Sequence, residues 1–253
     1  MPDKKDIRRQ KDEIKNLIRN SSSENHIPGI HNYCDRWCEK CEFTDRCATY
    51  SFEESSKEVF SDPDAKWDHL SIILNATFEY LSEELKKHGY TEEQMAAMAD
   101  EASPEEEVKP EDNELHTFAL DYGTKVHQWI KDNDSLISSL PFLTKKINGI
   151  KVSEYIDIIT WYHLFICAKS DRALGGLNDK SEFSVSDSNG SAKIALIAVE
   201  RSIASWGALL NVLESDEDSI YTFLKMLFTI KKQLNALFPH AEEFVRPGFD
   251  EKL

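Results

Sequence analysis

Two stretches decide the fold: EYIDIITWYHLFICAKSDRAL, residues 154–174, and AKIALIAVERSIASWGALLNVL, residues 192–213. Both would be apolar on nearly every side of a helix, and helices of this kind pack in the centre of a bundle. The sequence between them, residues 175–191, begins with two glycines and ends with "SNGS", so it predicts a long polar loop with a C-cap and an N-cap at its ends. These features indicate an all-α protein.

Three further segments, near residues 67–81, 115–130 and 218–238, repeat apolar residues with the 3.6-residue period of a helix. No region has the alternation expected of strands. We therefore expect a helical bundle of about five long helices, preceded by an N-terminal cysteine-rich metal-binding segment. The predicted division is residues 1–60 for the N-terminal helix and cysteine-rich segment and 61–253 for the bundle, with an acidic linker near 101–112.

The overall charge limits the classes of partner. The chain has 253 residues, with 46 acidic against 30 basic side chains and a formal net charge of −16, so its surface repels nucleic acids and anionic lipids. There is no run of 18 apolar residues, and the N-terminus is too charged for a signal peptide. We predict a cytoplasmic protein that binds neither nucleic acid nor membrane. In that reducing compartment, clustered cysteines favour metal binding over disulfides.

The sequence HNYCDRWCEKCEFTDRCATY, residues 31–50, contains four of the five cysteines with the spacing C-x3-C-x2-C-x5-C. Thiolates select zinc, Cu(I) or iron-sulfur clusters over hard cations. One continuous run of cysteines is typical of a 4Fe-4S cluster, whereas structural zinc sites usually use two separated pairs. A 4Fe-4S cluster is therefore the favoured cofactor and zinc the alternative, with His26 and His31 close enough to replace a thiolate. The predicted ligands are Cys34, Cys38, Cys41 and Cys47.

Parts of this spacing resemble known cluster motifs. Cys34, Cys38 and Cys41 form C-x3-C-x2-C, which resembles the cluster loop of radical SAM enzymes. The chain departs from that family, because it lacks the pattern of a β/α barrel and has Lys40 where an aromatic residue is usual. Cys38, Cys41 and Cys47 form C-x2-C-x5-C, which resembles auxiliary clusters of SPASM-type domains and the cluster of Cas4-like nucleases. The resemblance covers about ten residues and implies a cluster, not a particular reaction.

A second candidate site lies in the two central helices. Glu200 and Arg201 interrupt an apolar run, so we expect Glu200 to be buried and to need a polar partner. Either a polar pocket or a structural ion-pair network fits this pattern. The possible partners share the central helices with them, and the whole candidate set is Asp157, His163, Lys169, Arg172, Glu200 and Arg201.

Two other hypotheses concern a di-iron site and a cysteine nucleophile. No long helix has the Glu-x-x-His motif of di-iron bundles, although His116 and other scattered ligands leave a looser version open. Cys167 is expected to be a buried apolar thiol, and its alternative role is a nucleophile with His163 four residues earlier.

Three functions follow from these sites. The favoured one is a redox protein whose cluster passes electrons to a protein partner or to a small-molecule substrate. The second is an interaction protein stapled by zinc, whose acidic surface meets a basic partner. The third is a bundle enzyme that uses Glu200 and His163 for acid-base chemistry and in which the metal is structural.

Overall fold

The computed structural model describes residues 4–20, 24–60, 66–101, 109–139, 142 and 144–251, and it confirms the all-α class. The chain forms two compact units. Unit 1 comprises residues 1–31 and 38–106, and unit 2 comprises residues 32–37 and 107–253. The predicted boundary at residue 60 adjoins residues 61–65, and most of the predicted acidic linker is residues 102–108; both stretches lie outside the described residues.

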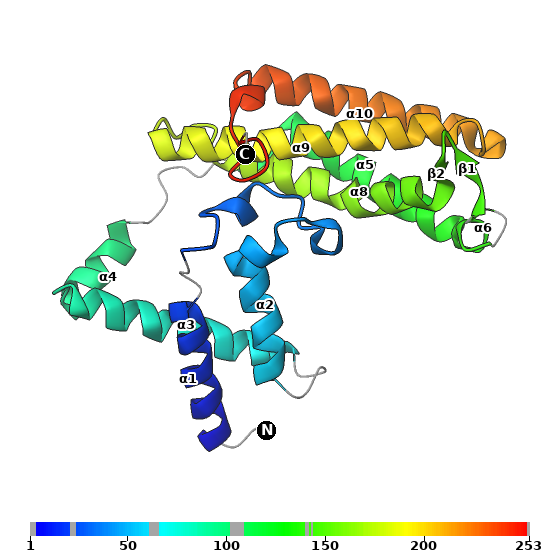
Figure 1. The fold of residues 1–253 in the computed structure, drawn as a ribbon. Helices are drawn as coiled ribbons and strands as arrows, with labels where there is room; N and C mark the ends of the chain where they lie inside the picture. Colours follow the sequence, from blue (N-terminus) through cyan, green and yellow to red (C-terminus); the bar gives the residue numbers. More distant parts are fainter. Residues whose placement is uncertain are drawn as a thin grey trace. The chain divides into compact units, whose positions relative to one another are not determined.

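Unit 2 is built around four long helices that run side by side (Figure 1). Helix α8 packs against α5 and α9, and α10 completes the bundle by packing against α9 and α5. These helices are α5 (Glu114–Asp132), α8 (Val152–Gly175), α9 (Glu182–Leu209) and α10 (Glu217–Leu237). The two stretches that predicted central helices are therefore neighbours in one bundle.

Aromatic residues from three of these helices meet in the core. Trp206 on α9 is fully buried, and its ring packs on Trp129 at 5.0 Å and on Phe223 at 4.8 Å between centroids. The Trp206 indole N–H donates to the hydroxyl of Tyr122, which is also fully buried, at 3.1 Å. Each buried indole or phenol thus keeps a polar partner, as an apolar interior requires.

Helix α9 begins earlier than predicted. Ser181 accepts a hydrogen bond from the backbone N–H of Ser184, so the N-cap lies seven residues before the start of the predicted "SNGS" cap. The "SNGS" sequence is inside the helix, where Gly190 has a packing role. A Cβ on Gly190 would lie 2.5 Å from the ring of Tyr33 and 2.8 Å from the ring of Phe244. The glycine therefore permits close approach of two side chains and does not form a turn.

Shorter elements complete unit 2. A small antiparallel hairpin, which the sequence pattern did not predict, joins β1 (Lys146–Ile147) to β2 (Ile150–Lys151). Its turn residues Asn148 and Gly149 both have positive φ, the conformation that a two-residue hairpin turn needs. The other short elements are η4 (Pro110–Asp112), α6 (Asp134–Ile137), η5 (Glu214–Asp216) and η6 (Ala241–Glu243).

Unit 1 consists of shorter helices and the cysteine segment. Helix α1 packs against both α2 and α3. Among the described residues of this unit, the elements are α1 (Lys4–Asn20), η1 (Ile30–Asn32, whose last residue belongs to unit 2), η2 (Cys38–Lys40), η3 (Thr44–Arg46), α2 (Ala48–Val59), α3 (Lys66–Lys87) and α4 (Glu92–Glu101). None of the helices described in either unit is long and apolar enough to cross a membrane.

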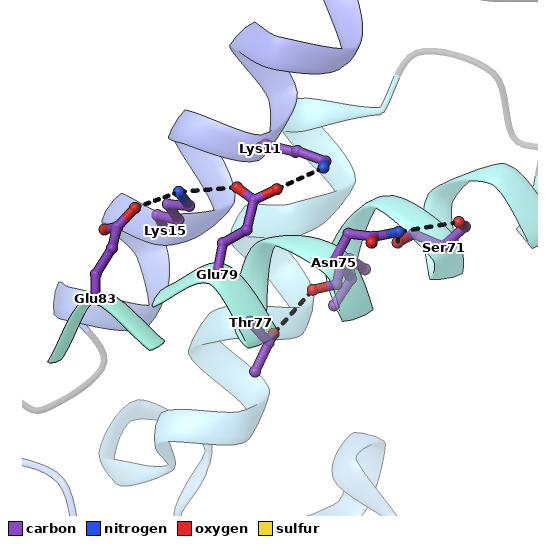
Figure 2. A network of polar contacts seen from close by, with 8 residues as sticks. Lys11, Lys15, Ser71, Asn75, Thr77, Glu79 and Glu83 are labelled. Atoms are coloured by element: carbon purple, nitrogen blue, oxygen red, sulfur yellow. Dashed lines mark hydrogen bonds and ion pairs between the residues drawn. The ribbon is translucent and has the colours of Figure 1, made fainter. Parts of the chain in front are cut away.

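The long helix predicted near residues 67–81 is α3, and it packs on α1 in unit 1 and not among the four helices of unit 2. Charged side chains join the two helices (Figure 2). Lys11 contacts Glu79 at 2.7 Å, and Lys15 contacts Glu79 at 2.9 Å and Glu83 at 2.8 Å. These carboxylates raise the pKa of Lys15, so the ammonium stays charged where α1 meets α3.

Candidate metal centre

The last three cysteines of the predicted metal segment lie in two short turns of unit 1. The backbone N–H of Cys41 donates to the carbonyl of Cys38 at 3.2 Å, which closes η2. The N–H of Cys47 donates to the carbonyl of Thr44 at 3.4 Å, which closes η3. Phe43, which lies between the two turns in sequence, is buried. The cysteines are thus presented by compact backbone turns and not by an extended loop.

All four cysteines of this segment are half-buried, and none of them forms a disulfide among the described residues. The backbone N–H of Phe43 donates to the sulfur of Cys41 at 3.4 Å, the kind of hydrogen bond that stabilises an anionic sulfur. Within unit 1, Cys38, Cys41 and Cys47 do not bring their sulfurs within 4.8 Å of one another as a group. The thiols are therefore not gathered as ligands of one small ion.

Asp35 attaches the first part of the segment, residues 32–37, to the helices of unit 2. Its carboxylate accepts from the hydroxyl of Tyr162 at 2.6 Å and from the guanidinium of Arg201 at 2.9 Å. Its backbone carbonyl accepts from the indole N–H of Trp161 at 2.8 Å. Burial is the main reason that the pKa of Tyr162 is raised, and the hydrogen bond to Asp35 adds to it, so this hydroxyl remains a donor.

Trp37 adds an aromatic contact to the same attachment. Its ring stacks on Trp161 with centroids 5.2 Å apart and meets Tyr162 edge-on at 6.1 Å. Between Asp35 and Trp37, Arg36 has a φ of 59°, in the left-handed region that non-glycine residues rarely adopt. This turn lets two residues so close in sequence contact neighbouring side chains of α8.

Two cations of α8, the buried Lys169 and the exposed Arg172, hold the start of the segment. Lys169, which is buried, donates to the carbonyl of Asn32 at 2.9 Å, and Arg172 pairs with Asp187 at 2.6 Å. The hydroxyl of Tyr33 donates to the same carboxylate oxygen, Asp187 Oδ1, at 2.9 Å. The segment is thus tied to α8 and to α9 by charged hydrogen bonds.

Cys34 lies within this attached segment, so its environment is defined by unit 2. Burial raises the pKa of the Cys34 thiol, while a backbone hydrogen bond at Arg36 and the positive charges of Arg36 and Lys169 act in the opposite direction. These cations would stabilise a thiolate once the sulfur is bound to a metal.

The polar residues predicted to form a site inside the bundle are divided among separate contacts. Lys169, Arg172 and Arg201 hold residues 32–37 on the outside of α8 and α9, as described above. Asp157 is exposed. His163 is buried, its Nδ1 is 2.6 Å from the carbonyl of Thr160, and its ring stacks on His127.

Glu200 is exposed, contrary to the prediction of a buried carboxylate. It pairs with Lys231 of α10 at 2.8 Å, and its described contacts include none of the expected partners His163, Lys169, Arg172 and Arg201. The helical phase explains the error: Val199 and Ser202 face the core, while Glu200 and Arg201 between them face outward. The structure therefore does not bring Glu200 and His163 together for acid-base chemistry.

One group of ligand atoms was not predicted as a set. His116, Cys167 and Asp171 each place one ligand atom within 4.8 Å of the others, and no other such group occurs in the part of the chain that the structure describes. Cys167 and Asp171 are four residues apart on one helix face, a signal visible in the sequence, but His116 comes from another helix. Only packing of α5 against α8 unites the three.

Comparisons with protein-family models, with curated proteins and with solved structures find no match to this chain.

Proposed function

We propose that Cys34, Cys38, Cys41 and Cys47 bind one metal centre, with a 4Fe-4S cluster favoured, and that the protein acts in electron transfer. The observation that carries this proposal is the set of four half-buried cysteines, none of them in a disulfide, on a segment whose backbone forms hydrogen-bonded turns. In a reducing compartment, such thiols are suited to metal binding.

The surroundings of the cysteines fit an anionic metal–thiolate centre. The amide of Phe43 donates to the Cys41 sulfur, and the charges of Arg36 and Lys169 act on Cys34. Hydrogen bonds and cations near the sulfurs offset negative charge and tune the centre's potential. A bound cluster would supply one-electron chemistry, while these residues would hold and shield it.

The spacing of the thiols is one reason to favour a cluster over zinc. Zinc–sulfur bonds of about 2.3 Å in a tetrahedron require sulfurs about 3.8 Å apart. Cys38, Cys41 and Cys47 are more widely spaced than such a group. The thiolates of a cubane bind different irons, so they stand farther apart. Cys34 is only four residues before Cys38, which limits their Cα separation to about 14 Å.

The aromatic contacts of Trp37 favour a redox role. This residue immediately precedes Cys38, and its stack on Trp161 and edge contact with Tyr162 form a continuous group of rings. Aromatic rings beside a cluster exclude water, which influences its reduction potential. A partner protein or a small substrate would receive the electrons.

The alternative is an interaction protein in which zinc staples the same cysteines. The net charge of −16 favours a basic partner over a nucleic acid. In this case the metal would supply folding free energy to the N-terminal segment and no redox chemistry.

Metal analysis of protein purified without air tests the proposal. We expect iron and acid-labile sulfide in equal amounts, a broad visible absorption and reversible bleaching by a reductant. Cys41→Ser should lose the cluster, while Cys167→Ala, outside the segment, should keep it. One zinc and no iron per chain would replace the redox function with the zinc alternative, and absence of both metals would overturn the site.

Amide hydrogen exchange tests whether the metal stabilises the cysteine segment. Removal of the metal, or Cys41→Ser, should speed amide hydrogen exchange in residues 38–47 and leave α8 and α9 protected, because metal binding contributes to folding of the cysteine segment only. Unchanged exchange in this segment would contradict a structural contribution of the metal.

A further inference from the structure

Cys167, the one cysteine outside the N-terminal segment, lies beside two polar side chains of unit 2, His116 and Asp171. Asp171 contacts His116 Nδ1 with one oxygen at 2.8 Å and accepts from the Cys167 thiol with the other at 3.5 Å. The three ligand atoms lie within 4.8 Å of one another. Cys167 and Asp171 lie on α8, and His116 lies in the first turn of α5.

The cluster is at the edge of the core and not in its centre. Cys167 is 6% exposed, whereas the side chains of His116 and Asp171 are 19% and 29% exposed. A small ion can therefore reach the ligands from solvent through the imidazole and the carboxylate. The sulfur lies deepest, where water would compete least for the metal.

The surroundings of Cys167 argue against a free nucleophile. Burial raises the pKa of its thiol to about 12, and the carboxylate of Asp171 acts in the same direction. The thiol is therefore protonated at neutral pH, and its hydrogen-bond partner is an acceptor, which does not activate a nucleophile. His163, the base considered from sequence, contacts Thr160 and His127.

We propose that His116, Cys167 and Asp171 bind one divalent transition-metal ion of the zinc class. One nitrogen, one sulfur and one oxygen donor form a mixed set that suits zinc and excludes magnesium and calcium, which prefer oxygen ligands alone. Thiolate and carboxylate together balance the charge of a divalent ion. Three protein ligands leave a further position for water, the arrangement of a zinc site that can act on a substrate.

Binding requires only local changes. The thiol proton passes to solvent as the sulfur binds the ion, and His116 would bind the ion through Nδ1. The nitrogen and oxygen that now share a hydrogen bond at 2.8 Å separate slightly to become two ligands of one ion. The ion would then join the start of α5 to the last turns of α8.

Cobalt titration of the full-length chain tests this site apart from the proposed cluster. In the variant C34S/C38S/C41S/C47S, Cys167 is the only remaining cysteine. We expect one Co²⁺ per chain, with a thiolate-to-metal charge-transfer band and the visible bands of tetrahedral cobalt, and displacement of Co²⁺ by Zn²⁺. This variant lacks the four cysteines of the proposed N-terminal centre. A negative result therefore concerns the site at His116, Cys167 and Asp171 and not the proposed cluster.

Matched variants identify the ligands. Cys167→Ala should abolish the charge-transfer band, and His116→Gln and Asp171→Asn should each weaken binding by more than the roughly 10- to 100-fold that loss of an outer partner costs. His127→Gln on α5 and Asp157→Asn on α8 should leave binding unchanged. No charge-transfer band, or equal affinity in ligand and control variants, would overturn the proposal.

If the fourfold serine variant does not fold, the wild-type chain supplies the same test. Zinc analysis of Cys167→Ala against wild type, after saturation with zinc and removal of excess, should show one fewer zinc per chain. Equal zinc content would contradict the site.

Discussion

Helices α3 and α8 both carry large apolar residues at helical spacing, but the two sets of side chains have different surroundings. On α3, in unit 1, Trp67, Leu74 and Phe78 are 83%, 60% and 74% exposed. On α8, in unit 2, Ile159 and Ile166 are fully buried. An apolar periodicity therefore predicts that a helix forms, and the neighbouring elements decide which of its faces is covered.

Segments outside the four bundle helices also cover α8 and α9. Residues 32–37 contact one side of this pair, and the C-terminal residues return to α9, where Lys193 pairs with Asp250 at 2.7 Å. In contrast, α3 packs on α1, to which the ion pairs of Lys11 and Lys15 join it, and the buried apolar residues of α3 are Ile72 and Ala76. Helices that receive distant segments of the chain bury more faces than helices that do not.

The largest expected effect comes from replacing a buried tryptophan of unit 2, and an exposed tryptophan of α3 is its control. Trp206→Ala should lower the free energy of unfolding by roughly 3 to 5 kcal/mol, because it leaves a cavity among Trp129, Phe223 and Tyr122. Trp67→Ala on α3 should change it by less than about 0.5 kcal/mol. Urea denaturation of both variants measures the difference, and equal losses would show that the surface of α3 is covered in solution.

The attachment of residues 32–37 gives the next largest effect. Asp35→Ala should cost roughly 2 to 3 kcal/mol, because Tyr162 and Arg201 both lose a charged hydrogen-bond acceptor. Hydrogen exchange should accelerate in residues 32–37. Asp45→Ala, an exposed carboxylate in the same cysteine segment, is the control and should have little effect. Similar behaviour of the two variants would mean that the attachment contributes no stability.

Two glycines of α9 provide a finer test of close packing. Gly190→Ala should destabilise the protein by roughly 1 to 2 kcal/mol, because its Cβ would overlap the rings of Tyr33 and Phe244. Gly207→Ala should stabilise it by about 0.4 to 1 kcal/mol, because its Cβ would meet nothing within 4 Å. Thermal denaturation of both variants measures whether each one loses or gains stability. A gain of stability in Gly190→Ala would show that Tyr33 does not pack against this position.

The smallest expected effect is at Glu200. Glu200→Gln should change the free energy of unfolding by less than about 0.5 kcal/mol, because the pair with Lys231 is exposed and screened by water. A double-mutant cycle with Lys231→Met measures the pair directly. A coupling above about 1 kcal/mol, the upper limit for exposed pairs, would support the buried carboxylate expected from sequence.

The sequence by itself determined the all-α class and most of the long helices. Apolar periodicity is a local property, so the residues of α5, α8 and α10 could be assigned to helices without knowledge of their neighbours. The spacing of Cys34, Cys38, Cys41 and Cys47 is equally local, and it led to the prediction of a metal centre that remains to be tested. The start of α9 was missed, because polar residues near Ser181 resemble a loop until their helix is packed.

Tertiary structure alone decided which polar groups meet. Glu200 and Arg201 are adjacent in sequence, yet one pairs with α10 and the other with Asp35, which is 166 residues away along the chain. His116 likewise reaches Asp171 only because α5 packs against α8. The physical reason is range: helix formation depends on neighbours within a few residues, whereas an ion pair or a ligand set depends on which distant surfaces the folded chain brings into contact.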